Sequence, residues 1–143
     1  MAGKKAKDLA SLIRLNSWGV DERRRELGVL LARESDFLRE QAALERQMVE
    51  ERAAAAADPA GSGFMFGSFA AYHRQRREEL AARLALLRAE IDAARERLAA
   101  AYRQLKVYEE VRDARLEAER KEEARIEQAS LDEIALTQHL RRN

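Results

Sequence analysis

The sequence predicts an all-α fold: a long two-helix antiparallel coiled-coil hairpin with a longer second helix. Charged residues make up 37% of the chain and aromatic residues only 6%, with one Pro and no Cys. This composition is typical of long helices. Apolar residues recur at alternating spacings of three and four on both sides of the Pro. We therefore expect a single hairpin over residues 1–143, with helices at about 8–56 and 69–140 and a turn at about 57–68.

The most regular pattern lies in the second expected helix. Nine successive positions at heptad spacing are all apolar, which is the pattern of a coiled-coil seam. Such a seam requires a second helix to cover it. Its positions are Leu80, Leu84, Leu87, Ile91, Ala94, Leu98, Ala101, Leu105 and Tyr108.

The first expected helix carries a matching but interrupted seam. Polar residues occupy it at Asn16, Arg23, Glu34 and Gln41, where they cost stability but can fix register or partner choice. They are either tolerated in a thin, wet interface or meet another protein. The apolar seam positions are Leu9, Ile13, Val20, Leu27, Leu30, Phe37, Leu44 and Met48.

The turn is predicted from Pro59, which disfavours a helical conformation at Asp58. Several Gly residues follow, and we expect the chain to fold back at residues 61–66. Ser68 is the expected N-cap of the second helix.

Large apolar residues gather in and just after this expected turn. They either plug the open end of the two-helix core or form a docking patch, since exposed apolar clusters mark interaction sites. The residues are Phe64, Met65, Phe66, Phe69 and Tyr72.

The fold-back would place residues 20–48 against 80–108 and leave residues after about Glu127 without a partner helix. At 1.5 Å per residue the helices would span roughly 75 Å and 105 Å. Residues 1–25 carry a net charge of +4 and residues 112–133 a net charge of −3. We expect this opposite charge to favour antiparallel pairing, although each exposed ion pair is worth only about 0–1 kcal/mol.

The sequence offers little for catalysis or for metal binding. His73 and His139 lie far apart, and no other ligand stands near either at metal-site spacing. The Gly residues of the turn lack the Lys-Ser/Thr step of a phosphate-binding loop. We therefore expect no catalytic, cofactor-binding or metal-binding residues, and no cofactor.

The N-terminal end is basic, yet a net charge of +1 and the lack of a groove-reading motif argue against nucleic-acid binding. Attachment to a membrane surface stays open, although Asp21 and Glu22 oppose it. Trp18 falls at an f-type heptad position beside Gly19. It either anchors an interface or lies along Arg stems of its own helix. The basic residues are Lys4, Lys5, Lys7, Arg23, Arg24 and Arg25.

The chain lacks features of a membrane-spanning or exported protein. No stretch approaches the ~18 consecutive apolar residues of a spanning helix, and no signal-type apolar block follows the basic start. The absence of Cys fits a reducing compartment. We expect a cytoplasmic protein.

Several short motifs resemble the FliJ family, the small coiled-coil proteins of the bacterial flagellar protein-export apparatus. Two runs resemble the start of the sequences of that family: Leu12-Ile13-Arg14-Leu15 and, after it, Val20-Asp21-Glu22-Arg23-Arg24-Arg25. Three further stretches agree in order and spacing, whereas the run Ala53–Ala57 and Phe64-Met65-Phe66 match no family motif. The agreeing stretches are Phe69-Ala70-Ala71-Tyr72, Lys106-Val107-Tyr108-Glu109 and Leu131-Asp132-Glu133-Ile134-Ala135.

The resemblance implies a stalk-like, non-catalytic component that links the hexameric export ATPase to the membrane export gate and assists export chaperones. Its place would be cytoplasmic, peripheral to the inner membrane at the flagellar base, with membrane association through partners, and its cellular role would be in motility and chemotaxis. The resemblance puts Leu12, Ile13, Asp132 and Glu133 on the ATPase side. It puts a second set near the gate: Gln41, Leu44, Met48, Phe69 and Tyr72.

Two other functions stay open from the residues. One is a generic coiled-coil adaptor or spacer unrelated to export. The other is a surface-binding protein whose basic end meets anionic lipid or nucleic acid, with strongly salt-dependent binding through Arg23, Arg24 and Arg25. Oligomeric state is undecided, because a swapped or parallel dimer would bury the same seams.

Overall fold

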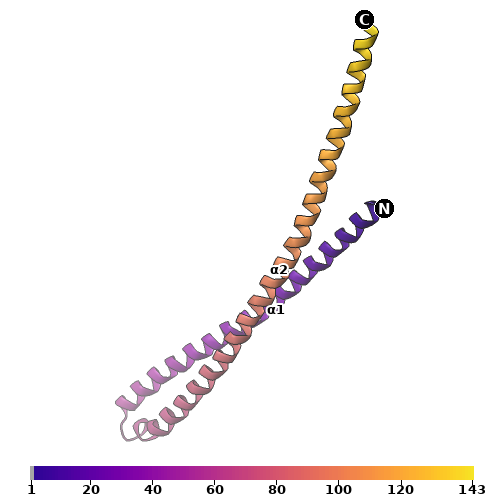
Figure 1. Cartoon of the computed structure of the whole chain (residues 1–143). Coiled ribbons are helices and arrows are strands. Elements are labelled where there is room, and N and C mark those ends of the chain that lie inside the picture. Colours follow the sequence, from indigo (N-terminus) through magenta and orange to yellow (C-terminus); the bar gives the residue numbers. More distant parts are fainter. Residues whose placement is uncertain (1) are drawn as a thin grey trace. The chain divides into compact units, whose positions relative to one another are not determined.

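The chain folds into two α-helices joined by a four-residue turn. The computed structural model describes residues 2–143, and side chains from residue 3 onward. Helix α1 spans Ala2–Ala57 and helix α2 spans Ser62–Arg142, with no strand among the described residues (Figure 1). The predicted all-α hairpin with a longer second helix is confirmed.

The helix boundaries differ from those expected around the turn. The turn covers residues 58–61 rather than 57–68, so α2 begins seven residues before the expected 69. Phe64, Met65 and Phe66 therefore lie on a helix and not in a loop. Ser68 lies inside α2, so its expected role as N-cap was wrong.

Asp58 takes the capping role instead. Its carboxylate accepts hydrogen bonds from the backbone N–H of Gly61 at 3.1 Å and of Ser62 at 3.4 Å. Its carbonyl accepts one from Gly63 N–H at 2.8 Å, and its own N–H donates to the Ala54 carbonyl at 3.1 Å. Asp58 thus follows the last turn of α1 with its own N–H and caps the start of α2 with its carboxylate. An Asp side chain suits this second role because it can satisfy the free N–H groups of a first helical turn.

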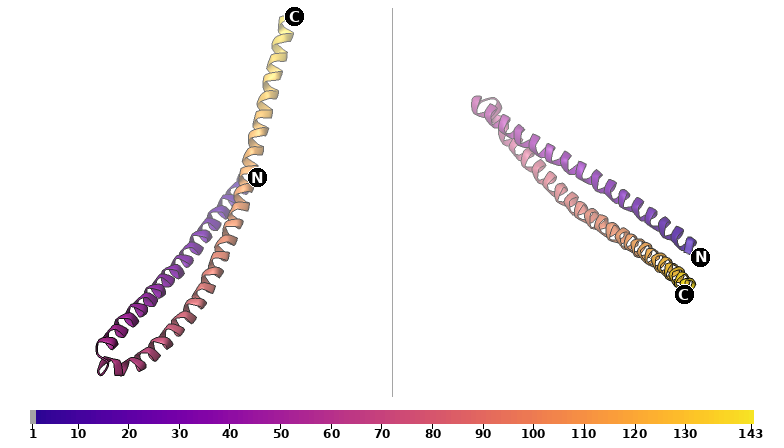
Figure 2. Two further views of the ribbon diagram at one scale, coloured as in Figure 1. Left: turned by 90° about the vertical axis from the view of Figure 1, so that its left-hand side faces the viewer. Right: turned by 90° about the horizontal axis from the view of Figure 1, so that it is seen from above.

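Residues Asp21–Ala100 form one compact unit, called here the turn unit. It contains residues 21–57 of α1, the turn and residues 62–100 of α2, and the two helices run antiparallel (Figure 2). Its core is one stripe of α2 that packs against half-buried seam residues of α1. The buried residues of that stripe are His73, Leu80, Leu84, Leu87, Ile91 and Ala94.

Ion pairs between the two helices border this stripe. Arg88 Nε lies 3.2 Å from Glu34 Oε2, and Arg76 Nη2 lies 2.5 Å from Glu40 Oε1. The hydrogen bond and the charge of Glu40 raise the pKa of Arg76 above its ordinary value. Glu34, a polar interruption of the predicted seam, thus finds its partner inside the hairpin.

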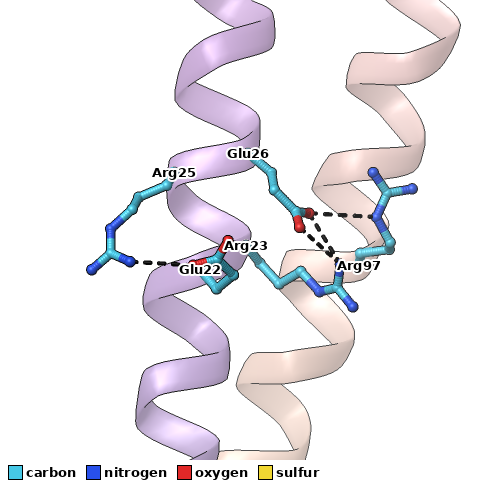
Figure 3. Close-up of polar contacts among 5 residues, drawn as sticks. All are labelled: Glu22, Arg23, Arg25, Glu26 and Arg97. Carbon is cyan, nitrogen blue, oxygen red and sulfur yellow. Dashed lines mark hydrogen bonds and ion pairs between the residues drawn. The ribbon is translucent and has the colours of Figure 1, made fainter.

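Arg23, a second polar interruption, is also paired within the turn unit. Its guanidinium lies 3.0 Å from Glu26 Oε2, and the same carboxylate lies 3.9 Å from Arg97 on α2 (Figure 3). Arg25 pairs with Glu22 at 3.2 Å on the side of α1 that faces away from α2. The arginines of this stretch are therefore largely compensated by neighbouring carboxylates.

The terminal unit joins the residues up to Val20 with Ala101–Asn143. Leu9 and Val20 are buried in it, and Ile13 and Asn16 are half-buried between them. Asn16 Nδ2 donates a hydrogen bond to the Leu12 carbonyl at 2.8 Å, which satisfies this polar seam residue on its own helix. The α1 seam predicted from the sequence therefore continues into this unit.

In the terminal unit α2 extends well past the start of α1 (Figure 1). Every residue from Glu110 to Asn143 is exposed. The acidic residues here form ion pairs along α2 itself, for example Glu117 with Arg120 at 2.7 Å and Glu122 with Arg125 at 2.8 Å. The predicted unpartnered segment therefore exists, and α2 carries exposed side chains well before the expected Glu127.

Candidate protein-binding surfaces

Three groups of exposed apolar residues are candidates for binding other proteins. The first is the C-terminal surface of the terminal unit, which lies on the part of α2 beyond residue 125. Its side chains are between 52% and 66% exposed, although they are Leu and Ile, residues that are usually buried. They stand among charged residues, and Ile126, Leu136 and Leu140 share one side of the helix, whereas Leu131 and Ile134 lie round from it. The members are Ile126, Leu131, Ile134, Leu136 and Leu140.

Asp132 and Glu133 lie within this C-terminal surface and are exposed, as are their neighbours. Gln128 Nε2 donates a hydrogen bond to Asp132 Oδ1 at 2.9 Å, and Thr137 Oγ1 donates one to the Glu133 carbonyl at 3.0 Å. Both carboxylates can still be reached by a cationic partner. Their role as contact residues stays a prediction.

An open cleft of about 440 Å³ lies between the start of α1 and residues 112–119 of α2 in the terminal unit. Leu9 and Leu116 give it apolar walls, and Lys5, Arg115 and Glu119 stand around it. A cleft of this kind has room for one or two apolar side chains of a partner, with charged groups at the rim to orient them.

The second candidate is the start of α1, where Leu12, Leu15 and Trp18 are 40%, 61% and 63% exposed. Ile13 is half-buried, because it belongs to the seam rather than to the outer surface. Trp18 points away from the partner helix, as its heptad position predicts. Leu12 and Trp18 are available to a partner, whereas Ile13 is available only in part.

The third candidate is the tip surface of the turn unit. Phe64, Met65 and Tyr72 are 83%, 63% and 64% exposed. Phe66 and Phe69 are half-buried, and their ring centroids lie 6.4 Å apart. The group of large apolar residues expected near the turn therefore divides in two. Phe66 and Phe69 close the end of the core, and the other three residues face solvent.

His73 is the residue of this end that sequence reasoning missed. It is 2% exposed, its Nε2 lies 2.7 Å from the Leu44 carbonyl of α1, and its ring centroid lies 6.0 Å from that of Phe69. The signal was present, since His73 stands seven residues before Leu80 on the same heptad position. A polar residue there was not read as part of the seam.

Gln41, Leu44 and Met48 are half-buried on the α1 side of the turn unit. The Leu44 carbonyl is engaged by His73. These positions pack within the hairpin, and only their outer edges can meet a partner. Their predicted contact with the gate stays a prediction.

The described residues hold no cluster of three or more His, Cys, Asp or Glu side chains that could bind a metal ion. No helix in residues 2–143 is long and apolar enough to cross a membrane. The described buried side chains leave no N or O atom without a hydrogen-bond partner.

A comparison with protein families finds one match that covers nearly the whole chain. The family described as "Flagellar FliJ protein" matches residues 5–143. No curated protein matches the chain. No solved structure matches it.

Proposed function

The chain belongs to the FliJ family of flagellar proteins, which makes it a component of the bacterial flagellar export apparatus, and we propose that it is a non-catalytic stalk there. It would join the hexameric export ATPase to the membrane export gate and assist export chaperones. Its place would be at the cytoplasmic side of the flagellar base, and its loss would impair motility.

The observation that carries this proposal is the C-terminal surface. Within the terminal unit, α2 extends beyond the start of α1 with Leu136 and Leu140 60% and 66% exposed. Each such side chain gains roughly 1.5–3 kcal/mol when it is fully buried. A protein that held these side chains in water without a partner would lose solubility for no gain. We assign the C-terminal surface, with Leu12, Asp132 and Glu133, to the ATPase.

The tip surface is assigned to the gate. Phe64, Met65 and Tyr72 belong to the turn unit and share no residue with the C-terminal surface. Aromatic side chains at the centre of an interface carry much of its binding energy. Two separate surfaces allow the protein to hold two partners at once. Neither task requires a catalytic residue.

A crossed binding experiment tests both assignments. We expect Leu136→Gln with Leu140→Gln to weaken binding of the purified ATPase hexamer at least about tenfold, because two buried apolar side chains are lost. The same variant should bind the gate's soluble domain as the parent does. Phe64→Ala with Tyr72→Ala should give the opposite result. All four positions are exposed, so circular dichroism should show an intact helical hairpin in both variants.

Each variant is thus the control for the other. If neither variant changes either affinity, the stalk assignment is wrong, and the result favours a generic adaptor that binds other proteins. If both variants lose both partners, the two surfaces do not act separately.

A further inference from the structure

The start of α1 has an outer face that its own chain leaves uncovered. Five positions spaced by three, four, four and three residues share one side of the helix, opposite the seam of Leu9, Ile13 and Val20. All five are exposed, with Leu15 and Trp18 61% and 63% exposed. We call this the basic-apolar face. Its members are Lys4, Lys7, Ser11, Leu15 and Trp18.

Charge on this face is uncompensated, unlike that of the arginines that follow. Among the described residues no ion pair involves Lys4, Lys7 or the neighbouring Arg14. Residues 2–20 contain four basic residues and a single acidic one.

The Arg23–Arg25 cluster behaves differently. Arg23 is paired with Glu26 and Arg25 with Glu22 (Figure 3). Arg24 lies 3.9 Å from Asp21. The positive charge available to an outside partner is therefore that of the first 20 residues. The three arginines from which salt-dependent binding was expected are held by carboxylates of their own helix.

We propose that the basic-apolar face binds directly to the surface of an anionic lipid bilayer. A helix that carries Lys and Arg beside Leu and Trp lies in the plane of the bilayer surface, with the apolar side chains below the headgroups. Trp suits this depth because its ring is apolar and its N–H can stay in the wet layer. Lys4 and Lys7 extend their ammonium groups to lipid phosphates from the same side.

Charge complementarity selects this occupant. The exposed apolar residues of the C-terminal surface provide the contrast, because residues 120–142 hold as many basic as acidic side chains. An anionic bilayer therefore attracts residues 2–20, which carry excess positive charge, and not residues 120–142, which carry none. Each basic residue near such a surface strengthens binding about fivefold.

The geometry allows membrane binding without unfolding. Leu9, Ile13 and Val20 turn toward the interior of the terminal unit, and the basic-apolar face is on the opposite side of α1. The helix can therefore rest on lipid while its seam stays packed. This contact is separate from the proposed stalk function, since it involves neither the C-terminal surface nor the tip surface, and Leu12, which is assigned to the ATPase, is not a member of the face.

Trp18 is the only Trp of the chain, so its fluorescence reports on this face alone. We expect its emission to shift to shorter wavelength when vesicles of phosphatidylglycerol and phosphatidylethanolamine are added to the purified full-length protein. Vesicles of phosphatidylcholine should cause no shift. Raised salt should reverse the shift, because screening weakens attraction between exposed charges.

Two charge-matched variants then locate the site. Lys4→Gln, Lys7→Gln and Arg14→Gln together should weaken binding to the anionic vesicles about 100-fold, on the scale of about fivefold per residue. Arg23→Gln, Arg24→Gln and Arg25→Gln remove the same formal charge and should weaken it no more than about fivefold. Equal losses in both variants would show that net charge, and not this face, governs binding.

Two other results would overturn the proposal. One is an unchanged Trp18 emission with anionic vesicles. The other is a shift that appears only when the ATPase hexamer is added without lipid, which would make the face a protein-docking surface. The vesicle assay contains neither the ATPase nor the gate, so a negative result there leaves the stalk function untouched. A negative result in the crossed binding experiment likewise leaves the lipid contact untouched.

Discussion

The two halves of α2 carry similar apolar residues, which are buried in one half and exposed in the other. In the turn unit Leu80, Leu84 and Ile91 are 1%, 5% and 2% exposed. In the terminal unit Ile126 and Leu136 are 55% and 60% exposed. Both sets stand at coiled-coil spacing, and both belong to one continuous helix. The difference is that α1 packs against the first set and does not reach the second set.

This comparison shows that a heptad pattern predicts a need for a partner and not which molecule provides it. In the turn unit the partner is the chain itself, and the pattern becomes a stable core. In the terminal unit the same pattern stays exposed, which is why we regard it as a surface for another protein. Three predictions test the contrast, in order of decreasing effect.

The largest effect is expected from truncating the buried seam. Leu80→Ala should lower the free energy of unfolding by about 2–4 kcal/mol, because the lost side chain is 1% exposed and leaves a cavity. Leu136→Ala removes the same atoms from an exposed position and should change it by less than about 0.5 kcal/mol. Thermal and urea unfolding of the two variants provide the measurement. Similar losses in both would mean that the C-terminal surface is also packed in solution.

The turn that starts α2 gives a smaller effect whose sign depends on position. A Cβ at Gly61 would overlap Oδ2 of Asp58, so Gly61→Ala must displace the capping carboxylate. We expect a loss of about 1 kcal/mol in unfolding free energy. Gly67→Ala meets nothing within 4 Å and should stabilise α2 by about 0.5–1 kcal/mol. Stabilisation by both substitutions would show that the Asp58 cap does not contribute.

The smallest effect is expected from the ion pairs within α2 in the segment that α1 does not cover. Hydrogen bonds from Arg125 to Glu122, at 2.8 Å and 3.1 Å, hold the pKa of Glu122 below its ordinary value. Because the pKa of Glu122 is lowered, the ion pair stabilises the helix fully when the pH is above the ordinary pKa of a Glu carboxyl. This stabilisation is lost as the pH falls through the lowered pKa of Glu122.

Arg125→Gln should therefore raise the pKa of Glu122 toward its ordinary value, as an NMR titration of its side-chain carboxyl resonance would show. An unshifted Glu122 in the variant would show that the pair does not persist in solution.

Much of the fold could be predicted from the sequence because its signals are periodic and local. The heptad positions Leu80 to Tyr108 are all buried or half-buried, as the spacing requires. Trp18 is exposed, as its heptad position requires. Pro59 marks the turn correctly, since its ring disfavours a helical conformation at Asp58 and removes one N–H from the helical hydrogen bonds.

The details of the turn and of the seam's end could not be predicted in the same way. The capping role of Asp58 depends on a carboxylate reaching N–H groups three and four residues later, and Ser68 was an equally acceptable cap by residue type. The burial of His73 depends on the Leu44 carbonyl, 29 residues away in the chain. A polar seam residue is acceptable only when such a partner is present.

The sequence by itself determined that this protein is made of two long helices, where the chain turns and which stripe of each helix is apolar. These features follow from backbone preferences and from periodicity, which act over a few residues. Only the tertiary structure decided which apolar positions are covered. Burial depends on where α1 begins and ends against α2, and that register is set by packing across the hairpin rather than by any single segment. The same packing left Leu136, Leu140 and Trp18 in contact with solvent, and on these exposed residues the proposed functions depend.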